Sequence, residues 1–465
     1  MGKSFECAIA FPSMSQIQKA DSQAMPAQIS LLTAVLLVIA SMLGSGILTT
    51  TGSIVSCVKS SDAVILVWGI AGLHALFGAY CYGSIMRRMP VNGGEASMLK
   101  KFFTPALGEI AGWVSFIVGF AASNAATAIG FGAYLEKAVP NFTMDLKVPA
   151  LVAIVAVTAL HSFTGPLGLR IQTGMAALKF AMLLGIMVWG LSLAPMPAVL
   201  SADAAISATP FGSAWGVAIM LSMFAYLGWS AAIYSAAETR DARRNVPRAM
   251  MLGTLVVLIL YVGVNLAVLR HIPISELASE KAVMELLAKK LFGSGVAEIF
   301  SGVVAFALLS SLGVSAFLGP RVLKTMLQWY RKSPSREEAP GLLLIWLQAA
   351  ISMIMIVSGT FEQILTVTGF LLGVFPIIAV LGLYTRVANE SHPVSALTRL
   401  VAVPIFISGS ALILVLGAIE KPAEMAVAVA ILFLIYMLRR CVSGGLTRDI
   451  AENEKSSTIH TDQSP

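Results

Sequence analysis

Two long apolar segments of this chain are each interrupted near the middle by glycine. The first runs from residue 29 to about residue 58 and is interrupted at Gly44-Ser45-Gly46; the second runs from 211 to about 237 and is interrupted around Tyr226-Leu227-Gly228-Trp229. In hydrocarbon an unpaired backbone group costs several kcal/mol, so a broken helix persists only where its free amides and carbonyls meet protein, water or a ligand. Breaks at corresponding positions of two chain halves indicate the binding site of a membrane carrier.

The composition is that of a membrane protein with many helices. The 465 residues are 57% hydrophobic and 12% charged, with a mean hydropathy of +0.84, whereas soluble domains carry about 25% charged residues. One span needs about 20 apolar residues, so the chain has room for about twelve. We expect an all-α membrane protein with spans near 29–58, 62–86, 106–135, 148–164, 171–194, 211–238, 247–270, 295–320, 340–358, 361–385, 399–418 and 423–440.

The loops predict the orientation in the membrane. Residues 1–28 hold no cleavable signal and residues 441–465 are polar, so both are expected to be tails on the same side. Placing both tails in the cytoplasm satisfies the positive-inside rule. The basic residues that then face the cytoplasm are Arg87, Arg88, Lys100, Lys101, Arg240, Arg243, Arg244, Arg248, Arg321, Lys324, Arg331, Lys332 and Arg336. We expect an integral protein of the plasma (inner) membrane.

The first break offers two kinds of charge partner. The half-helix before Gly44 exposes carbonyls that include that of Met42, and the half-helix after it presents the amides of Ser45, Gly46 and Ile47. A helix N-terminus favours anions and a C-terminus favours cations. Glycine also lets a ligand approach the backbone closely. This pairing suits an α-amino acid, although a packing contact of small residues explains Gly44-Ser45-Gly46 alone equally well.

The second break shifts the balance toward a binding site. The half-helix before it ends with the carbonyls of Phe224 and Ala225, and Gly228 is the break glycine. The rings of Phe224 and Trp229 flank the break. Aromatic residues in an apolar helix are usually core, but beside a second broken backbone they are more consistent with the wall of a pocket.

Several motifs resemble those of the amino acid/polyamine/organocation superfamily, in order and spacing, over residues 29–440. They are Gly-Ser-Gly-Ile at 44–47, Pro90-Val-Asn-Gly-Gly-Glu95, Phe224-Ala-Tyr-Leu-Gly-Trp229, Glu238-Thr-Arg-Asp-Ala-Arg-Arg-Asn-Val-Pro-Arg248, Ser310-Ser-Leu-Gly-Val-Ser-Ala-Phe-Leu-Gly-Pro-Arg321 and Gly341-Leu-Leu-Leu-Ile-Trp-Leu-Gln348. Departures occur at Ala96-Ser97-Met98, where the family usually has tyrosines, at Met326-Leu-Gln-Trp-Tyr330 and at Ala242. They bear on gate details rather than on the fold.

The resemblance implies alternating access around an inverted repeat of two five-helix units. These units would be residues 29–194 and 211–385, followed by two additional helices at 399–440. The resemblance also implies a role for each break. Ser45, Gly46 and Ile47 would hold the substrate carboxylate, and Met42, Phe224 and Ala225 its amino group.

Lys179 is the only charged side chain more than about two turns inside an expected span. A charge at that depth costs at least about 2.5 kcal/mol and needs a partner or a task. The segment from Gln172 to Lys179 is similar to the fifth helix of sodium-independent superfamily members, whose lysine ammonium stands where relatives bind sodium. Ser310 and Ser311 are the expected oxygen partners, and desolvation makes proton carriage by Lys179 chemically reasonable.

Other chemistry is not indicated. The four cysteines, Cys7, Cys57, Cys81 and Cys441, form no metal spacing, so we expect no metal and no cofactor. No nucleophile and base pattern suggests an enzyme, and no catalytic residue is assigned. The net charge of +7 follows from the topology, so we expect no nucleic-acid partner. The loop with the sequon Asn141-Phe-Thr143 has no cysteine that could link a heavy chain, so no covalent partner is expected.

The sequence therefore favours sodium-independent secondary active transport of amino acids, by proton symport or by exchange. A polyamine or organic-cation carrier is the alternative, but the spans contain no acidic residue at depth to hold such a substrate. A nutrient-sensing transceptor is a third interpretation, which the short tails disfavour.

Overall fold

The computed structural model describes residues 29–89, 94–163, 167–196, 210–278, 280–329, 342–385 and 393–440. Within these ranges the chain is helical, and its only β-pairing is a single bridge between Ile29 and Thr239. The expected tails, 1–28 and 441–465, and residues 90–93 of the second motif lie outside the described residues.

The described helices follow one another along the chain in this order. In the first half they are α2 (Leu31–Met42), α3 (Gly46–Thr49), α4 (Thr51–Val58), α5 (Ser61–Arg88), α6 (Gly94–Phe102), α7 (Pro105–Val114), the π-helix η1 (Ser115–Ala122), α8 (Ser123–Ala138), α9 (Lys147–Phe163) and α10 (Leu167–Ser192). In the second half they are α12 (Ser213–Ala225), η2 (Ala231–Ile233), η3 (Ala236–Glu238), α13 (Ala242–His271), α14 (Ile274–Leu277), α15 (Val283–Phe292), α16 (Ser294–Gln328), α17 (Leu342–Ser358), α18 (Phe361–Leu381), η4 (Gly382–Tyr384), η5 (Thr398–Ala402), α19 (Val403–Glu420) and a last helix, Pro422–Arg440.

The described residues contain nine helices that are long and apolar enough to cross a membrane. Three shorter apolar helices, Lys147–Ser162, Ser213–Ala225 and Leu342–Ser358, coincide with the three remaining expected spans. The all-α membrane class is therefore confirmed. The count of twelve spans and the inverted repeat stay predictions.

Local sequence explains where several helices begin. Ser60 precedes α5 and accepts a hydrogen bond from the Ala63 amide, and Thr104 caps α7 in the same way ahead of Pro105. Thr360 forms a capping box with Gln363 at the start of α18. Each cap satisfies backbone amides that a helix start leaves unpaired.

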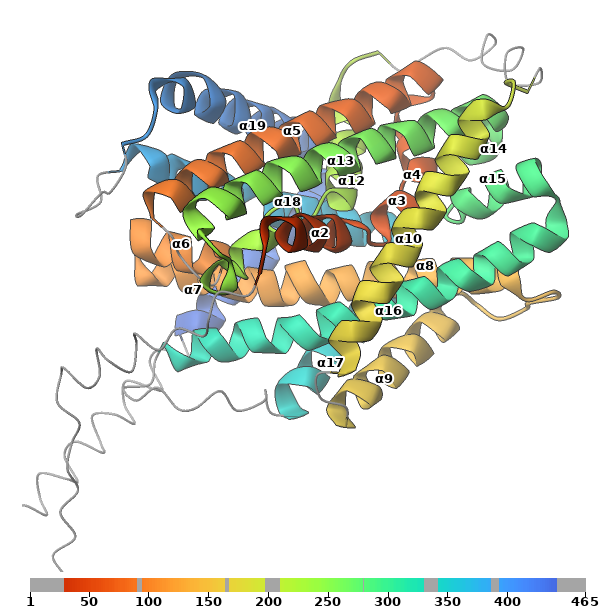
Figure 1. Cartoon of the computed structure of the whole chain (residues 1–465). Helices are drawn as coiled ribbons and strands as arrows, with labels where there is room; N and C mark the ends of the chain where they lie inside the picture. Colours follow the sequence, from red (N-terminus) through yellow and green to blue (C-terminus); the bar gives the residue numbers. More distant parts are fainter. Residues whose placement is uncertain are drawn as a thin grey trace, which may run out of the picture.

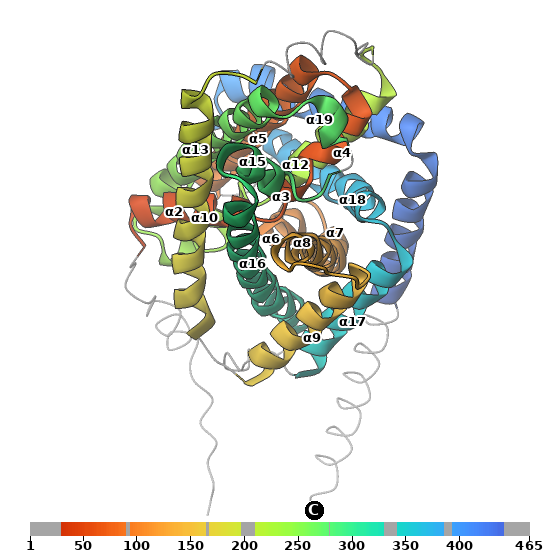
Figure 2. The ribbon, with the colours of Figure 1, turned by 90° about the vertical axis from the view of Figure 1, so that its right-hand side faces the viewer.

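The break of the first span lies inside the helix bundle, where all four residues of α3 are buried. In Figure 1, α5 and α13 run side by side on one side of α2 and α3, and α8 and α16 lie together on the other. Helix α12 packs against α3 and α4, so the two interrupted segments are neighbours. Figure 2 shows α9 beside α17 and the last helices, in blue, at the edge of the bundle. Helix α2 also lies at the edge in Figure 2.

The second broken span differs from the first beyond its interruption. After α12 ends at Ala225, the chain forms turns and the two short 3-10 helices η2 and η3, and no α-helix starts before Ala242. Gly228 has φ +106°, a left-handed conformation that ends a regular helix. A Cβ added there would lie 2.7 Å from the Ser41 carbonyl carbon, so this turn packs directly on the end of α2.

The start of the first broken span and the end of the second are joined at one end of the molecule. The Ile29 amide donates to the Glu238 carbonyl at 3.0 Å, and the Arg240 amide donates to the Ile29 carbonyl at 3.0 Å. We call this the basic end, because Arg88, Arg240 and Arg244 lie in or beside it. The bridge closes residues 226–241, hereafter the 226–241 segment, against the beginning of α2.

Candidate functional site

The first break has the geometry of a short unwound turn. Leu43 leaves the helical region with ψ 62°, and the Gly44 amide donates to the Met42 carbonyl at 2.7 Å. The buried Ser45 hydroxyl shares a hydrogen bond of 2.9 Å with that of Thr127 in α8. Ile47 is fully buried in the first turn of α3. The turn is therefore anchored to α8 through Ser45, and α3 begins with amides that have no partner further back in the helix.

The two breaks touch at Gly46 and Ala225. A Cβ added to Gly46 would lie 2.3 Å from Ala225 Cα, so only glycine lets the two backbones come this close. Gly44 is different, since the nearest atom to its added Cβ is the Met42 carbonyl oxygen at 4.0 Å. Of the two glycines, Gly46 is required by packing and Gly44 borders open space. The sequence could not separate these roles.

Tyr261 of α13 links the cut ends of both broken helices, and sequence analysis did not identify it. Its hydroxyl donates to the Met42 carbonyl at 2.6 Å and lies 3.3 Å from the Ala225 carbonyl oxygen. Its ring packs with Trp68 at 5.6 Å and Tyr226 at 5.2 Å between centroids. The carbonyls expected to hold an amino group therefore share one hydroxyl. No local pattern marks Tyr261, because its role comes from reaching across helices.

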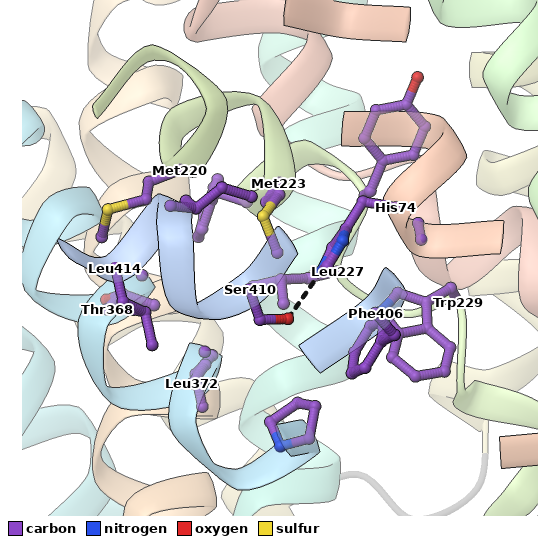
Figure 3. A pocket seen from close by; sticks show the side chains of 17 residues that line it. His74, Met220, Met223, Leu227, Trp229, Thr368, Leu372, Phe406, Ser410 and Leu414 are labelled. Atoms are coloured by element: carbon purple, nitrogen blue, oxygen red, sulfur yellow. Dashed lines mark hydrogen bonds between the residues drawn. The ribbon is translucent and has the colours of Figure 1, made fainter. Parts of the chain in front are cut away.

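A cavity of about 70 Å³ lies beside the second break, whose residues Tyr226, Leu227 and Trp229 form part of its lining. It is bounded by α5, α12, α18 and α19, and Figure 3 shows Met220, Met223 and Leu227 facing Leu372 and Leu414 across it. The other lining residues are His74, Ala75, Phe224, Thr368, Gly369, Gly373, Pro376, Phe406, Ser410 and Ile413. No Asp, Glu, Lys or Arg lines it, so it suits an uncharged group.

Two polar features interrupt the apolar wall. His74 Nε2 and the Ser410 hydroxyl form a hydrogen bond of 2.9 Å, drawn as a dashed line in Figure 3, and the His74 ring stacks on Phe406 at 4.6 Å. The Thr368 hydroxyl is buried and has no hydrogen-bond partner within the described residues. Because buried polar groups are nearly always paired, an orphaned hydroxyl in a cavity wall marks a point where a polar ligand atom fits.

The two predicted wall aromatics both border this cavity. Phe224 contributes from the last turn of α12. Trp229 lies between α5 and α19: its ring meets Tyr82 edge-on at 4.7 Å, and a Cβ on Gly78 would lie 3.1 Å from it. Phe224 and Trp229 thus line one cavity, while Ala225 meets Gly46 of the first break and Gly228 packs on the end of α2.

Asn124 of α8 is a further polar group on the side of the first break. Its amide oxygen is buried and has no hydrogen-bond partner in the described part of the chain. Thr127, which contacts Ser45, follows three residues later and so lies on the same face of α8. Asn124 therefore presents an unpaired acceptor about one turn of α8 away from the Thr127 hydroxyl that contacts Ser45.

Lys179 forms a buried contact between α10 and α16. Its side chain is 5% exposed, and its ammonium donates to the Ser311 hydroxyl at 2.7 Å. The neighbouring Ser310 does not share this bond. The structure therefore brings together two of the three residues that were expected to act in coupling. Among the described residues, no group of three His, Cys, Asp or Glu side chains could hold a metal ion.

Comparison with curated proteins finds amino acid transporters. The chain is 24% identical over 396 residues to the mouse b(0,+)-type amino acid transporter 1, covering 82% of this chain and 79% of the relative. It is 25% identical over 362 residues to the serine/threonine exchanger SteT of Bacillus subtilis, covering 76% and 81%. It is 24% identical over 384 residues to the cystine/glutamate transporter of Pongo abelii, covering 77% and 73%.

One family model matches nearly all of the described chain. The model of the family described as "Amino acid permease" matches residues 29–438, a stretch that includes both breaks, Lys179 and the helices around the cavity. The superfamily resemblance read from the motifs is thereby confirmed, and a transporter rather than an enzyme is established. This integral membrane protein belongs to the amino acid permease family.

Proposed function

We propose that this permease carries neutral amino acids without sodium, by exchange or by proton symport. The observation that carries the sodium independence is the Lys179 ammonium bound to Ser311. A fixed positive charge between α10 and α16 repels a second cation, so it would replace sodium rather than assist it. Exchange is the favoured mode, because a relative in Bacillus subtilis is a serine/threonine exchanger.

A neutral side chain is supported by the cavity beside the second break. Its wall is apolar apart from the His74–Ser410 pair and the Thr368 hydroxyl. A cationic side chain buried there would lack a carboxylate partner, at a cost of several kcal/mol. A cavity of about 70 Å³ is also small, which favours small side chains. These features argue against a polyamine or organic-cation carrier.

The backbone of the substrate would bind between the two breaks. Ser45, Gly46 and Ile47 would hold its carboxylate at the start of α3. Its ammonium would meet the carbonyls of Met42 and Ala225 beside the Tyr261 hydroxyl. Phe224 and Trp229 would then face its side chain.

Orientation and partners follow the sequence-based expectations. We propose a plasma membrane protein with the basic end in the cytoplasm, since arginine-rich loops favour that side. We also propose that it works without a covalently linked heavy chain, because its loop at 139–147 contains no cysteine.

Uptake by proteoliposomes tests this function. Proteoliposomes are loaded with one neutral, acidic or basic amino acid at a time, and the uptake of external labelled L-serine is measured. Each measurement is made with sodium or choline outside, and with or without a proton gradient. We expect uptake that depends on internal neutral amino acid and is unchanged by choline. Lys179→Ala should lower uptake by at least tenfold, and Ser311→Ala should lower it more than Ser310→Ala.

Each contrary result has a distinct meaning. Uptake that requires sodium, or full uptake by Lys179→Ala, contradicts the lysine role. Proton symport rather than exchange is identified if uptake requires an inward proton gradient and does not depend on internal amino acid. Preference for a polyamine over serine would establish the alternative substrate class.

A further inference from the structure

A carboxyl group that the proposed transport cycle does not use lies at the basic end. Glu95, at the start of α6, accepts a hydrogen bond from the Tyr82 hydroxyl of α5. Tyr82 in turn meets the Trp229 ring edge-on at 4.7 Å. A Cβ added to Gly94 would lie 2.3 Å from the Tyr234 ring, so Tyr234 packs on the backbone next to Glu95. We call Glu95, Tyr82, Tyr234 and Trp229 the Glu95 cluster.

The cluster connects a rigid part of the fold to an irregular one. Tyr82 is fully buried within the long helix α5, whereas Trp229 and Tyr234 belong to the 226–241 segment, which has no α-helix. Irregular backbone depends on side-chain contacts to hold its position, because it lacks a continuous ladder of backbone hydrogen bonds. The Glu95 cluster is therefore a main attachment of this segment to α5. Tyr234 is 49% exposed, so water reaches the edge of the cluster.

No cation balances Glu95 in the part of the chain that the structure describes. Helices α7 and α18 make the most extensive contacts with α6, whose own Lys100 ammonium lies 4.1 Å from the centre of the Trp329 ring. Glu109 of α7 forms an ion pair with Arg439 at 2.6 Å. At the end of α18, Gly382 packs against the Phe102 ring of α6. Nearby on α5, Arg87 donates to Ser84 and Arg88 donates to the Gly382 carbonyl. The titratable groups facing Glu95 are thus the two tyrosines, Tyr82 and Tyr234.

Burial raises the pKa of Glu95 from 4.5 to about 7, and the hydrogen bond from Tyr82 opposes this rise only in part. A carboxylate freed into water returns to its ordinary pKa near 4.3. The packed arrangement therefore binds a proton more tightly than an opened one does. By linkage, protonation stabilises the packed state, and this stabilisation is lost as pH rises through about 7.

We propose that Glu95 is a proton-binding residue that controls opening of the basic end: with its proton bound, the 226–241 segment stays packed on α5, and loss of the proton favours its release. The ionised carboxylate has only one hydroxyl partner in the cluster, so opening relieves its desolvation. From pH 6 to pH 8 the ratio of packed to open molecules should fall about tenfold. The effect on transport rests on the proposed function; the effect on packing does not.

Hydrogen exchange tests the packing directly, without any substrate. Amide protection of the 226–241 segment is measured in the purified protein from pH 6 to pH 8 and corrected for intrinsic exchange rates. In the wild type, protection should fall about tenfold as pH rises. In Glu95→Gln, whose amide stays neutral, it should remain at its pH 6 level throughout. An equal pH dependence in Glu95→Gln, or none in the wild type, would overturn the proposal.

Two further variants separate the proton site from a merely structural contact. Tyr82→Phe removes the donor that favours the ionised carboxylate, so the midpoint of the pH dependence should move to higher pH. A midpoint that stays or moves lower contradicts this arrangement. Glu136→Gln, an exposed carboxyl at the end of α8, should follow the wild type; loss of the pH dependence there would also count against Glu95.

Serine exchange at equal pH on both sides supplies the functional readout. Wild-type exchange should change between pH 6 and pH 8, and Glu95→Gln exchange should not. If the protection data behave as expected but no neutral amino acid is exchanged, then the proposed function fails while the proton-controlled packing stands. If exchange is present and its pH dependence survives in Glu95→Gln, then the proposed function stands and control by the Glu95 proton fails.

Discussion

Trp229 is the residue whose placement most directly links packing to selectivity. It borders the cavity beside the second break, and its ring also contacts Tyr82 of the Glu95 cluster. Phe224 borders the same cavity from α12. One aromatic residue thus touches both the space proposed for a substrate side chain and the segment proposed to open.

Shortening these aromatics should change which amino acids compete best. Trp229→Ala and Phe224→Ala each enlarge the cavity, so larger apolar amino acids such as leucine and methionine should gain on serine by severalfold. The measurement is inhibition of serine uptake by a panel, normalised to folded protein. Trp189→Ala is the control, because Trp189 is 52% exposed on α10 and does not line the cavity. An unchanged ranking in both cavity variants would contradict the proposed side-chain pocket.

The sequence marks Lys179 as a functional candidate, but only the structure identifies its hydrogen-bond partner. Its depth within an apolar run indicates a charge with a task, since the insertion cost is about 2.5–3.5 kcal/mol. Which hydroxyl it meets depends on the rotation of α16, and that rotation selects Ser311 over Ser310.

At the scale of elements, the two glycines of the first break have different structural roles. Gly46 meets the Ala225 backbone with no space for a methyl group, and Gly44 borders open space. We therefore expect Gly46→Ala to separate α3 from α12, lowering the melting temperature and abolishing uptake. Gly44→Val should keep the melting temperature close to that of the wild type and still block uptake, because its side chain enters the proposed carboxylate site.

Thermal unfolding in detergent and uptake in proteoliposomes, measured on the same preparations, check this pair. Gly69→Val serves as the control, since Gly69 lies within α5 and an added Cβ there meets nothing within 4 Å. Near-normal uptake by Gly44→Val would mean that the carboxylate binds elsewhere. A stable and active Gly46→Ala would mean that the two breaks need not touch.

At the scale of the whole molecule, the two ends differ in charge and in contacts. At the basic end, Arg88 donates to the carbonyls of Gly382 and Leu383, and Ile29 bridges to Thr239. At the opposite end, Ser53 donates to Glu362, and Ser213 donates to Glu420. The orientation that the loops predict would place the basic end in the cytoplasm.

Labelling with a membrane-impermeant maleimide tests that orientation. In a background without native cysteines, Lys59→Cys and Lys421→Cys should react in intact cells. Lys101→Cys and Arg244→Cys should react only after permeabilisation. All four positions are exposed, so access depends on the side of the membrane. Labelling of Lys101→Cys and Arg244→Cys in intact cells would show that the protein has the opposite orientation in the membrane.

The sequence by itself determined the helical membrane class, the two interrupted spans and the unusual depth of Lys179. These are local properties, because hydropathy, glycine content and charge can be read within one segment of chain. The family resemblance was equally accessible, since its motifs are contiguous.

Only the tertiary structure decided which groups meet. Tyr261 reaches Met42 and Ala225, Glu95 meets Tyr82, and the 226–241 segment forms no α-helix although its composition is apolar. Such contacts depend on the depth and rotation of each helix relative to its neighbours. Periodicity along one helix does not contain that information, because in a membrane the lipid-facing and core-facing sides of a helix are both apolar.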